Sequence, residues 1–309
     1  MSKTKILITS TSFQDSPGRH HEILKKRRWN VDYKRGPLKK NKLIPIIGNY
    51  DGMICGDDEI DEDVLRAASK GLTKGISKYG VGTDKIDINA AEKLKIKIIN
   101  CPGINSRTVA EHVFGLLLSY KKNIHREYIK TREGNWPRFL GSEIFDSKFG
   151  VLGFGNIGKR VAYLAKSFGC KVYCYDKMNN KKDNAFTFCN SIEELFHIVD
   201  IVSLHINLNE SNHNIISKDL IFKHAKNGII IINTARGKLV DEDAVLLGIR
   251  ENIISGYLAD VLSEEPPIKK NNLLSDKNTL ITSHIASKTI ENVSKQAVEA
   301  INNLSKILT

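Results

Sequence analysis

Short apolar runs alternate with amphipathic segments along the first hundred residues. Runs rich in β-branched side chains predict strands, and these lie at residues 5–10, 31–34, 50–56, 74–80 and 96–100. Segments with apolar positions at helical spacing separate them, at residues 20–28, 61–70 and 87–94. A repeated strand–helix–strand order is typical of a parallel sheet with crossover helices.

The pattern changes at residue 106. Residues 106–134 predict one long helix, which Asn105 or Ser106 can cap and Gly134 can end. The alternation then restarts, with strands predicted at 149–152, 171–175, 200–206, 228–235, 254–261 and 279–284 and helices at 156–169 and 289–308. Residues 279–283 are mostly apolar and predict a buried strand. Two α/β units joined around the long helix are the simplest architecture for this order.

Composition adds limits to this picture. The 309 residues suffice for one large or two medium domains, and 41% hydrophobic and 27% charged residues are ordinary for a globular protein. No 18-residue apolar stretch predicts a membrane span. The net charge is +12, and basic residues crowd positions 19–42. We interpret them as a solvated helix face rather than a nucleic-acid site, because no nucleic-acid-binding motif accompanies them.

The cysteines predict neither disulfides nor a metal site. Their number is odd, and no spacing typical of a zinc site occurs among Cys55, Cys101, Cys170, Cys174 and Cys189. Most of them lie in apolar runs. We therefore expect reduced core thiols in a cytoplasmic protein.

A glycine-rich turn provides the first chemical signal. Gly153, Gly155 and Gly158 follow an apolar run and precede a helical pattern, and the next predicted strand ends at Asp176. This is the context of a dinucleotide site, in which the glycines admit a pyrophosphate at a helix N-terminus. Asp176 can accept hydrogen bonds from both ribose hydroxyls and would repel a 2′-phosphate, which favours NAD over NADP. The alternative is a structural turn without a ligand.

Hydride transfer requires an acid or base and an anchor for the substrate. Arg236, Glu265 and His284 all follow predicted strands, and ligands bind at the carboxyl ends of parallel strands. An arginine can bind a carboxylate through two hydrogen bonds, and a neighbouring carboxylate raises the pKa of a histidine. Considered alone, the arginine is more typical of a surface ion pair, and the histidine of a solvent-exposed strand end.

In combination these motifs resemble the D-isomer-specific 2-hydroxyacid dehydrogenase family, closest to its short phosphoglycerate dehydrogenases. The resemblance covers essentially the whole chain and is carried by "SKYGVGTDKIDINAAEK", "NCPGINSRTVAEHVFGLLL", "VLGFGNIGKRVA", "VSLHINL", "NTARGKLVDEDAV", "ADVLSEEP" and "SHIAS". The order of arginine, glutamate and histidine is part of the likeness.

The resemblance implies the roles of the site residues. Arg236 binds the substrate carboxylate and polarises the carbonyl, His284 donates the proton, and Glu265 pairs with His284. The implied substrate contacts are Lys78, Gly80, Val81, Gly82, Asn105 and Arg236, with Lys78 where some members place a phosphate-binding arginine. The implied NAD contacts are Gly153, Gly155, Asn156, Ile157, Gly158, Asp176, His205, Ile206, Thr234, Ala235, Arg236, Asp260, His284 and Ser287.

The resemblance also implies an architecture of two Rossmann-like or flavodoxin-like parallel-sheet domains with a cleft between them. A substrate domain of residues 1–100 and 288–309 would contain an inserted NAD-binding domain, residues 101–287. We expect a homodimer formed through the region of 106–134. The serine-sensing extension of longer phosphoglycerate dehydrogenases is not expected, because the chain stops after its final helix.

The substrate stays open among small anionic 2-hydroxy or 2-keto acids. 3-Phosphoglycerate is favoured by Lys78 and the basic composition, and glyoxylate, hydroxypyruvate and a D-lactate-type acid are the alternatives. Phosphite enzymes of this kind carry a lysine where this chain has Val81, which disfavours that activity. A non-enzymatic NAD(H)-sensing co-regulator is the alternative from another class, and the complete Arg–Glu–His set disfavours it.

Overall fold

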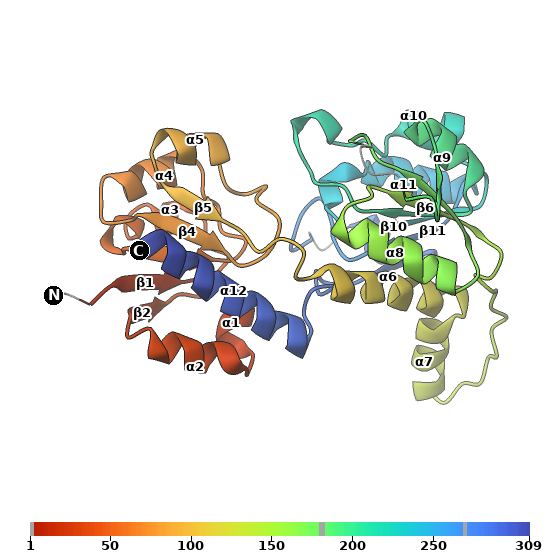
Figure 1. Cartoon of the computed structure of the whole chain (residues 1–309). Helices are drawn as coiled ribbons and strands as arrows, with labels where there is room; N and C mark the ends of the chain where they lie inside the picture. The colour runs from red at the N-terminus through yellow and green to blue at the C-terminus, as the bar shows by residue number, and fades with distance from the viewer. Residues whose placement is uncertain (1–2, 179–182, 268–270) are drawn as a thin grey trace. The chain divides into compact units, whose positions relative to one another are not determined.

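The computed structural model describes residues 3–178, 183–267 and 271–309. Internal contacts divide the chain into two compact units. Unit 1 is Met1–Asn105 with Ser287–Thr309, and unit 2 is Ser106–Ala286 (Figure 1). The boundaries expected from the sequence were 100/101 and 287/288. The chain thus leaves unit 1 and returns to it for a last helix.

Unit 1 is a parallel sheet covered on both faces. Its described strands lie in the order β2-β1-β3-β4-β5, with bounds Lys5–Ile8 (β1), Asn30–Tyr33 (β2), Gly52–Cys55 (β3), Gly75–Lys78 (β4) and Lys97–Ile99 (β5). Its helices are Thr11–Asp15 (α1), Arg19–Lys26 (α2), Lys40–Leu43 (α3), Glu62–Ser69 (α4), Ile88–Lys93 (α5) and Ile290–Leu308 (α12), with a 3₁₀ turn at Ile47–Asn49.

The strand β1 shows why these runs are continuously apolar. Ile6 and Ile8 pack in the core beneath α12, whereas Leu7 packs in the core on the opposite face. Successive strand residues point to opposite faces, so a strand covered on both sides needs apolar residues throughout. The helix α12 accordingly places Ala297 and Ile301 in the first of these cores.

Unit 2 is a larger parallel sheet. Its described strands lie in the order β12-β11-β10-β9-β6-β7-β8, with bounds Lys148–Leu152 (β6), Lys171–Tyr175 (β7), Thr187–Phe188 (β8), Ile201–Leu204 (β9), Ile229–Asn233 (β10), Ile254–Ala259 (β11) and Thr279–Ile281 (β12). Its helices are Ser106–Lys121 (α6), Ile124–Arg132 (α7), Asn156–Ser167 (α8), Ile192–Ile198 (α9), Lys218–His224 (α10) and Glu242–Arg250 (α11), with 3₁₀ turns at Glu210–Asn212, Gly237–Leu239 and Asn272–Leu274. The predicted class, two parallel-sheet α/β units, is confirmed.

The prediction of one long helix over 106–134 was wrong. The helix α6 ends at Lys121 and α7 begins at Ile124, because Asn123 between them has a left-handed φ of 56°. The Asn123 side chain donates to the Leu140 carbonyl at 2.9 Å. The Lys121 carbonyl accepts from the backbone of Ser142 at 2.7 Å. Tertiary hydrogen bonds thus stabilise the break.

The prediction of a buried strand at 279–283 also needs correction. The strand β12 spans only Thr279–Ile281, and all its residues are half-buried. It pairs with β11 at one edge of the described sheet, so one of its sides lacks a strand neighbour. Thr282, Ser283 and His284 belong to the turn that follows.

The structure confirms the predicted core thiols and the solvated face of the basic helix. All five cysteines are free and buried, and burial raises the pKa of Cys101 to about 11 and that of Cys174 to about 12. On α2, Lys25 and Lys26 are exposed, whereas Leu24 is buried. Among the described residues, no helix combines the length and apolarity that a membrane span requires, and no cluster of potential metal ligands was found in the same part of the chain.

Candidate active site

The three glycines of the turn after β6 meet different steric demands. Gly153 has a φ of 96°, and a Cβ there would lie 2.5 Å from the carbonyl oxygen of His205. A Cβ on Gly158 would lie 1.9 Å from the carbonyl oxygen of Gly153, so this glycine lets α8 pack on the turn. Gly155 faces open space, because a Cβ there would meet nothing within 4 Å among the described residues. The two outer glycines shape the turn, and the middle one leaves it open.

The open turn fits a dinucleotide diphosphate. Gly155 is the N-cap of α8 and supplies no side-chain cap, so the N–H groups of the first helical turn point into the space beside it. Asp176 directly follows β7, and its carboxylate accepts from the backbone N–H groups of Phe154 at 2.6 Å and Met178 at 2.8 Å. A carboxylate has lone pairs for further donors, such as ribose hydroxyls. These residues fit NAD as the sequence predicts.

His205 and Ile206 lie against the same turn. The His205 N–H donates to the carbonyl of Leu152 at 2.7 Å, which ties the end of β9 to the end of β6. The His205 ring shares a 2.8 Å hydrogen bond with the hydroxyl of Ser203. Burial lowers the pKa of His205 to about 3, so the ring is neutral at physiological pH.

Arg236 is held at the carboxyl end of β10. The buried Asn233 side chain accepts from the N–H of Ala235 at 3.0 Å and donates to the carbonyl of Arg236 at 2.9 Å. The next residue, Gly237, packs so tightly that a Cβ would lie 1.9 Å from the Leu262 backbone. The hydroxyl of Thr234 is buried without a hydrogen-bond partner among the described residues. A buried hydroxyl normally has a hydrogen-bond partner, so this hydroxyl of Thr234 is a candidate to contact a ligand.

His284 and Glu265 form a close pair. The His284 Nδ1 lies 2.7 Å from Glu265 Oε2, and Glu265 Oε1 accepts from the backbone N–H of Leu262 at 3.0 Å. Because an ionised carboxylate only accepts, Nδ1 carries the hydrogen of this bond and Nε2 is the atom that can exchange a proton with a substrate. The His284 side chain keeps 38% of its surface exposed.

Asp260 fixes the turn that carries His284. Its carboxylate accepts from the backbone N–H of Ile285 at 2.8 Å, the N–H of Ala286 at 2.7 Å and the hydroxyl of Thr282 at 2.6 Å. Its own carbonyl accepts from the N–H of His284 at 2.9 Å. Burial would raise the pKa of Asp260, but the hydrogen bonds from His112, Thr282 and the turn outweigh it and lower the pKa below the ordinary value. Asp260 is thus a charged, buried anchor.

His112 on α6 extends this network. Its Nε2 lies 2.9 Å from the Thr282 hydroxyl and 3.4 Å from Asp260 Oδ1. Thr282 donates its one hydrogen to Asp260, so it can only accept from His112. The Nε2 of His112 therefore carries a hydrogen.

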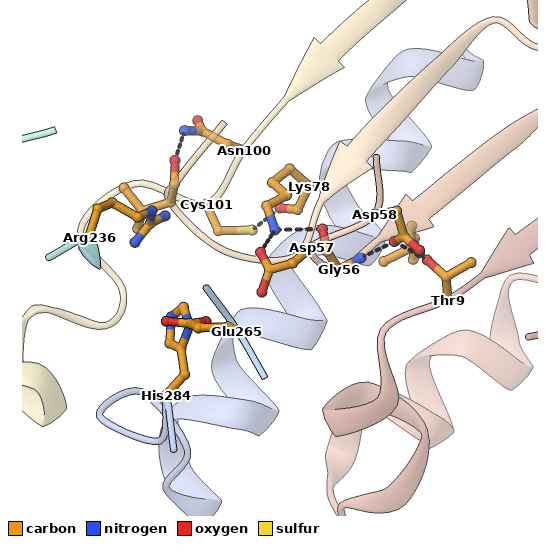
Figure 2. A network of polar contacts seen from close by, with 12 residues as sticks. Thr9, Gly56, Asp57, Asp58, Lys78, Asn100, Cys101, Arg236, Glu265 and His284 are labelled. Atoms are coloured by element: carbon orange, nitrogen blue, oxygen red, sulfur yellow. Dashed lines mark hydrogen bonds and ion pairs between the residues drawn. The ribbon is translucent and has the colours of Figure 1, made fainter. Parts of the chain in front are cut away.

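All the predicted substrate contacts except Arg236 belong to unit 1. Gly80 has a φ of 133°, and the carbonyl of Val81 accepts from the Asn100 side chain at 2.7 Å, which fixes the turn through Gly82. Lys78 is buried and donates to Asp57 and to the Gly56 carbonyl (Figure 2). Ser287 and Asn105 also fall in unit 1, unlike the sequence-based boundaries. The side-chain oxygen of Asn105 is buried and lacks a hydrogen-bond partner within the described ranges.

Four positioning residues escaped the sequence analysis, namely Asn233, His112, Thr282 and Asp57. Asn233 and Thr282 do leave a signal, because each is a polar residue at the end of an apolar run. The partners of His112 and Asp57 lie on other elements, so their contacts required the tertiary structure.

Comparisons with known proteins agree with this geometry. Residues 114–286 match the family model described as "D-isomer specific 2-hydroxyacid dehydrogenase, NAD binding domain". A hydroxypyruvate reductase of Thermotoga maritima is 35% identical over 280 residues, covering 88% of this chain and 89% of that protein. A D-3-phosphoglycerate dehydrogenase of Methanocaldococcus jannaschii is 32% identical over 310 residues, covering 98% of this chain but only 57% of that protein.

A solved structure shows the same fold throughout. The TT0316 protein from Thermus thermophilus superposes with a TM-score of 0.89 and 31% identity, covering 99% of this chain and 97% of that chain. The sequence motifs, the parallel sheets and these likenesses converge. The chain belongs to the D-isomer-specific 2-hydroxyacid dehydrogenase family, whose members are NAD-binding oxidoreductases.

Proposed function

We propose that the chain interconverts a small 2-hydroxy acid and its 2-keto acid with NAD(H), using His284 as the acid–base residue. The pair of His284 and Glu265 at 2.7 Å carries this proposal. It places a proton-exchanging nitrogen on a turn after a strand of the NAD-binding unit, where ligands of parallel sheets bind.

The residues divide the work in a defined way. NADH, when bound, supplies the hydride. His284 donates a proton from Nε2 to the keto oxygen, and Glu265 stabilises the ring in its charged form and fixes its orientation. Arg236 binds the carboxylate and polarises the carbonyl, and a guanidinium suits this because it offers two parallel donors. In the oxidation direction His284 takes the proton back.

The two units take separate roles in this proposal. Unit 2 binds NAD through Gly153, Gly155 and Gly158, Asp176 and the ends of β9 and β10, and residues 114–286 of it match the NAD-binding family model. Unit 1 holds the substrate carboxylate with the backbone N–H groups of Gly80, Val81 and Gly82. The preference for NAD over NADP is proposed from Asp176.

The candidates for the substrate remain phosphorylated and unphosphorylated acids. 3-Phosphoglycerate is supported by the resemblance, and hydroxypyruvate by the name of the 35%-identical relative. The surroundings of Lys78 favour the unphosphorylated acids. We also propose a cytoplasmic location, which the free buried thiols support.

A homodimer is proposed from the surface of α7 and the segment after it. None of the residues of α7 is buried, and large apolar side chains are exposed there, namely Ile124, Tyr128, Ile129, Trp136 and Leu140. Several large apolar side chains exposed on one segment are typical of association sites.

The activity test compares the wild type with His284→Ala and Glu265→Gln in NADH oxidation with glyoxylate, hydroxypyruvate, pyruvate and 3-phosphohydroxypyruvate. Loss of the acid–base residue should lower kcat by about 10²- to 10⁴-fold, whereas NADH binding, measured by fluorescence titration, should persist. Binding of NADH without turnover of any acid by the wild type would refute the enzymatic function and favour an NAD(H)-sensing protein.

A further inference from the structure

We infer that Asp57 makes this enzyme selective for 2-keto acids without a phosphate group, with hydroxypyruvate as the type of substrate. The inference rests on the proposed function and names its substrate class. It starts from a contact that the sequence did not predict, the ion pair between Lys78 and Asp57 (Figure 2).

The pair lies where a parallel sheet binds ligands. Lys78 is the last residue of β4, and Asp57 follows the end of the neighbouring β3. In unit 1 the strand order reverses between β1 and β3, and ligands bind outside the carboxyl ends of strands near such a reversal. The Gly80–Gly82 turn, which is proposed to hold the substrate carboxylate, begins two residues after Lys78.

The charge of Lys78 is already compensated. Its Nζ donates to Asp57 Oδ1 at 2.7 Å and to the carbonyl of Gly56 at 2.6 Å, and its side chain is only 5% exposed. A lysine ammonium has three hydrogens, and two of them are thus directed at protein oxygens. To bind a phosphate, the buried Lys78 ammonium would have to give up its bonds to Asp57 and Gly56.

At this edge the Asp57 carboxylate, rather than the Lys78 ammonium, is the charged group that solvent reaches. The Asp57 side chain is 56% exposed, far more than that of Lys78. Asp58 lies behind it and accepts hydrogen bonds from Thr9, Gly56 and Leu38, all of them neutral donors. A phosphate arriving here would approach an exposed carboxylate, with a second carboxylate close by.

This arrangement discriminates between the candidate acids. A phosphate monoester carries close to two negative charges at neutral pH, so Asp57 repels it. The hydroxyl of hydroxypyruvate is neutral and can donate a hydrogen bond to the same carboxylate. The site should therefore accept the hydroxyl and reject its phosphate ester.

The experiment measures kcat/KM with NADH for hydroxypyruvate and for 3-phosphohydroxypyruvate. The wild type should prefer hydroxypyruvate by at least about ten-fold, the order expected for a like-charge contact at a partly exposed site. Asp57→Asn should lower this preference by about ten-fold, chiefly by raising kcat/KM for the phosphorylated acid. Asp57→Ser should act in the same direction.

Asp32→Asn is the matched control. Asp32 is another half-exposed aspartate of unit 1 near a lysine, with Lys5 Nζ 4.0 Å away, and its side chain reaches Tyr50 at the amino end of β3, the opposite edge from Asp57. Its loss changes the net charge equally and should leave the preference unchanged. The double variant Asp57→Asn with Lys78→Met should lose the gain in phosphate use, because the released ammonium is absent.

The outcomes separate the two proposals. A wild type that prefers 3-phosphohydroxypyruvate, or an Asp57→Asn variant with an unchanged ratio and a wild-type melting temperature, would overturn the role of Asp57 while leaving the dehydrogenase function intact. No turnover of any acid would overturn the proposed function and this inference together.

Discussion

His284 adopts a left-handed backbone conformation, with a φ of 55°. A residue with a branched or ring-bearing side chain pays about 1 kcal/mol or more for this conformation, and it persists only where neighbouring contacts enforce it. Asp260 provides those contacts through the N–H groups of His284, Ile285 and Ala286. The conformation turns the histidine out of the strand direction and toward Glu265.

Asp176 offers a prediction at the same scale. Replacing Asp176 with alanine removes the carboxylate that would repel a 2′-phosphate, so the ratio of kcat/KM for NADH to that for NADPH should fall by about ten-fold or more. Steady-state kinetics with both cofactors provide the measurement. The ratio is informative even if loss of the bond to Phe154 loosens the glycine turn for both cofactors.

Asp183→Ala is the control for this change. Asp183 is an exposed aspartate of unit 2 that accepts from the hydroxyl of Tyr163 at 2.7 Å, so its loss alters the charge without touching the glycine turn. An Asp176→Ala enzyme with the cofactor ratio of the wild type would show that Asp176 does not face the ribose.

At the scale of elements, α6 and the turn after β12 are joined by a polar contact. His112 on α6 donates to Thr282, and Thr282 donates to Asp260, which fixes the His284 turn. Elements far apart in sequence therefore set the geometry of one side chain. A small displacement of a reacting group is costly to catalysis, so this contact should affect turnover more than binding.

His112→Leu tests the coupling. The Thr282 hydroxyl loses its donor, and kcat should fall about five- to ten-fold, in line with a hydrogen bond of about 1 kcal/mol, while the Kd for NADH changes less than about two-fold. His112→Gln, which restores a donor, should recover part of kcat. His125→Leu on α7 is the control, because His125 contacts the Ser119 carbonyl and the Tyr120 ring, neither of which belongs to the Asp260 network. Equal kcat for His112→Leu and the wild type would exclude the coupling.

Elements also show what the sequence could and could not predict. The described strands other than β8 were predictable, because apolar and β-branched runs leave a local signal, whereas the two-residue β8 was missed. The break at Asn123 was missed because its partners, Leu140 and Ser142, lie some twenty residues further along. The exposure of β12 depends on its place at the sheet edge, which periodicity does not encode.

In the candidate site, too, features with a local sequence signal could be predicted and tertiary contacts could not. Arg236, Glu265 and His284 were candidates because charged residues that follow strands collect at one edge of a parallel sheet, and their catalytic roles stay proposals. The partners of these residues were not predictable from local pattern. Lys78 is an example, because its place in the sequence suggested that it binds a phosphate, whereas in the structure it pairs with Asp57.

At the scale of the whole molecule, the half-buried His205 links stability to pH. Burial lowers the pKa of His205 to about 3, whereas an unfolded histidine titrates near 6.5. Below pH 6.5 the unfolded chain therefore binds a proton that the folded chain does not, and the free energy of unfolding falls as the pH falls. Well above pH 6.5 neither the folded nor the unfolded state binds a proton at His205, so His205 then makes the free energy of unfolding neither rise nor fall with pH.

Urea denaturation of the apoprotein at pH 7 and pH 5 measures this effect. Lowering the pH from 7 to 5 reduces the free energy of unfolding, and this reduction should be about 2 kcal/mol smaller in His205→Gln than in the wild type. The figure follows from about 1.4 kcal/mol per pH unit below pH 6.5. His213→Gln, which removes an exposed histidine, should behave as the wild type does. An equal loss in all three proteins would mean that His205 is protonated in the folded state at pH 5.

The break at Asn123 has an evolutionary consequence. Residues of α6 such as Val113 and Leu117 are fully buried, so their substitutions are restricted by the core. The helix α7 contributes no buried residue, so its surface can change without disturbing that packing. One asparagine thus separates a stretch whose substitutions the core restricts from a stretch that core packing does not constrain. Substitutions on α7 can therefore alter what its surface contacts without altering the core of unit 2.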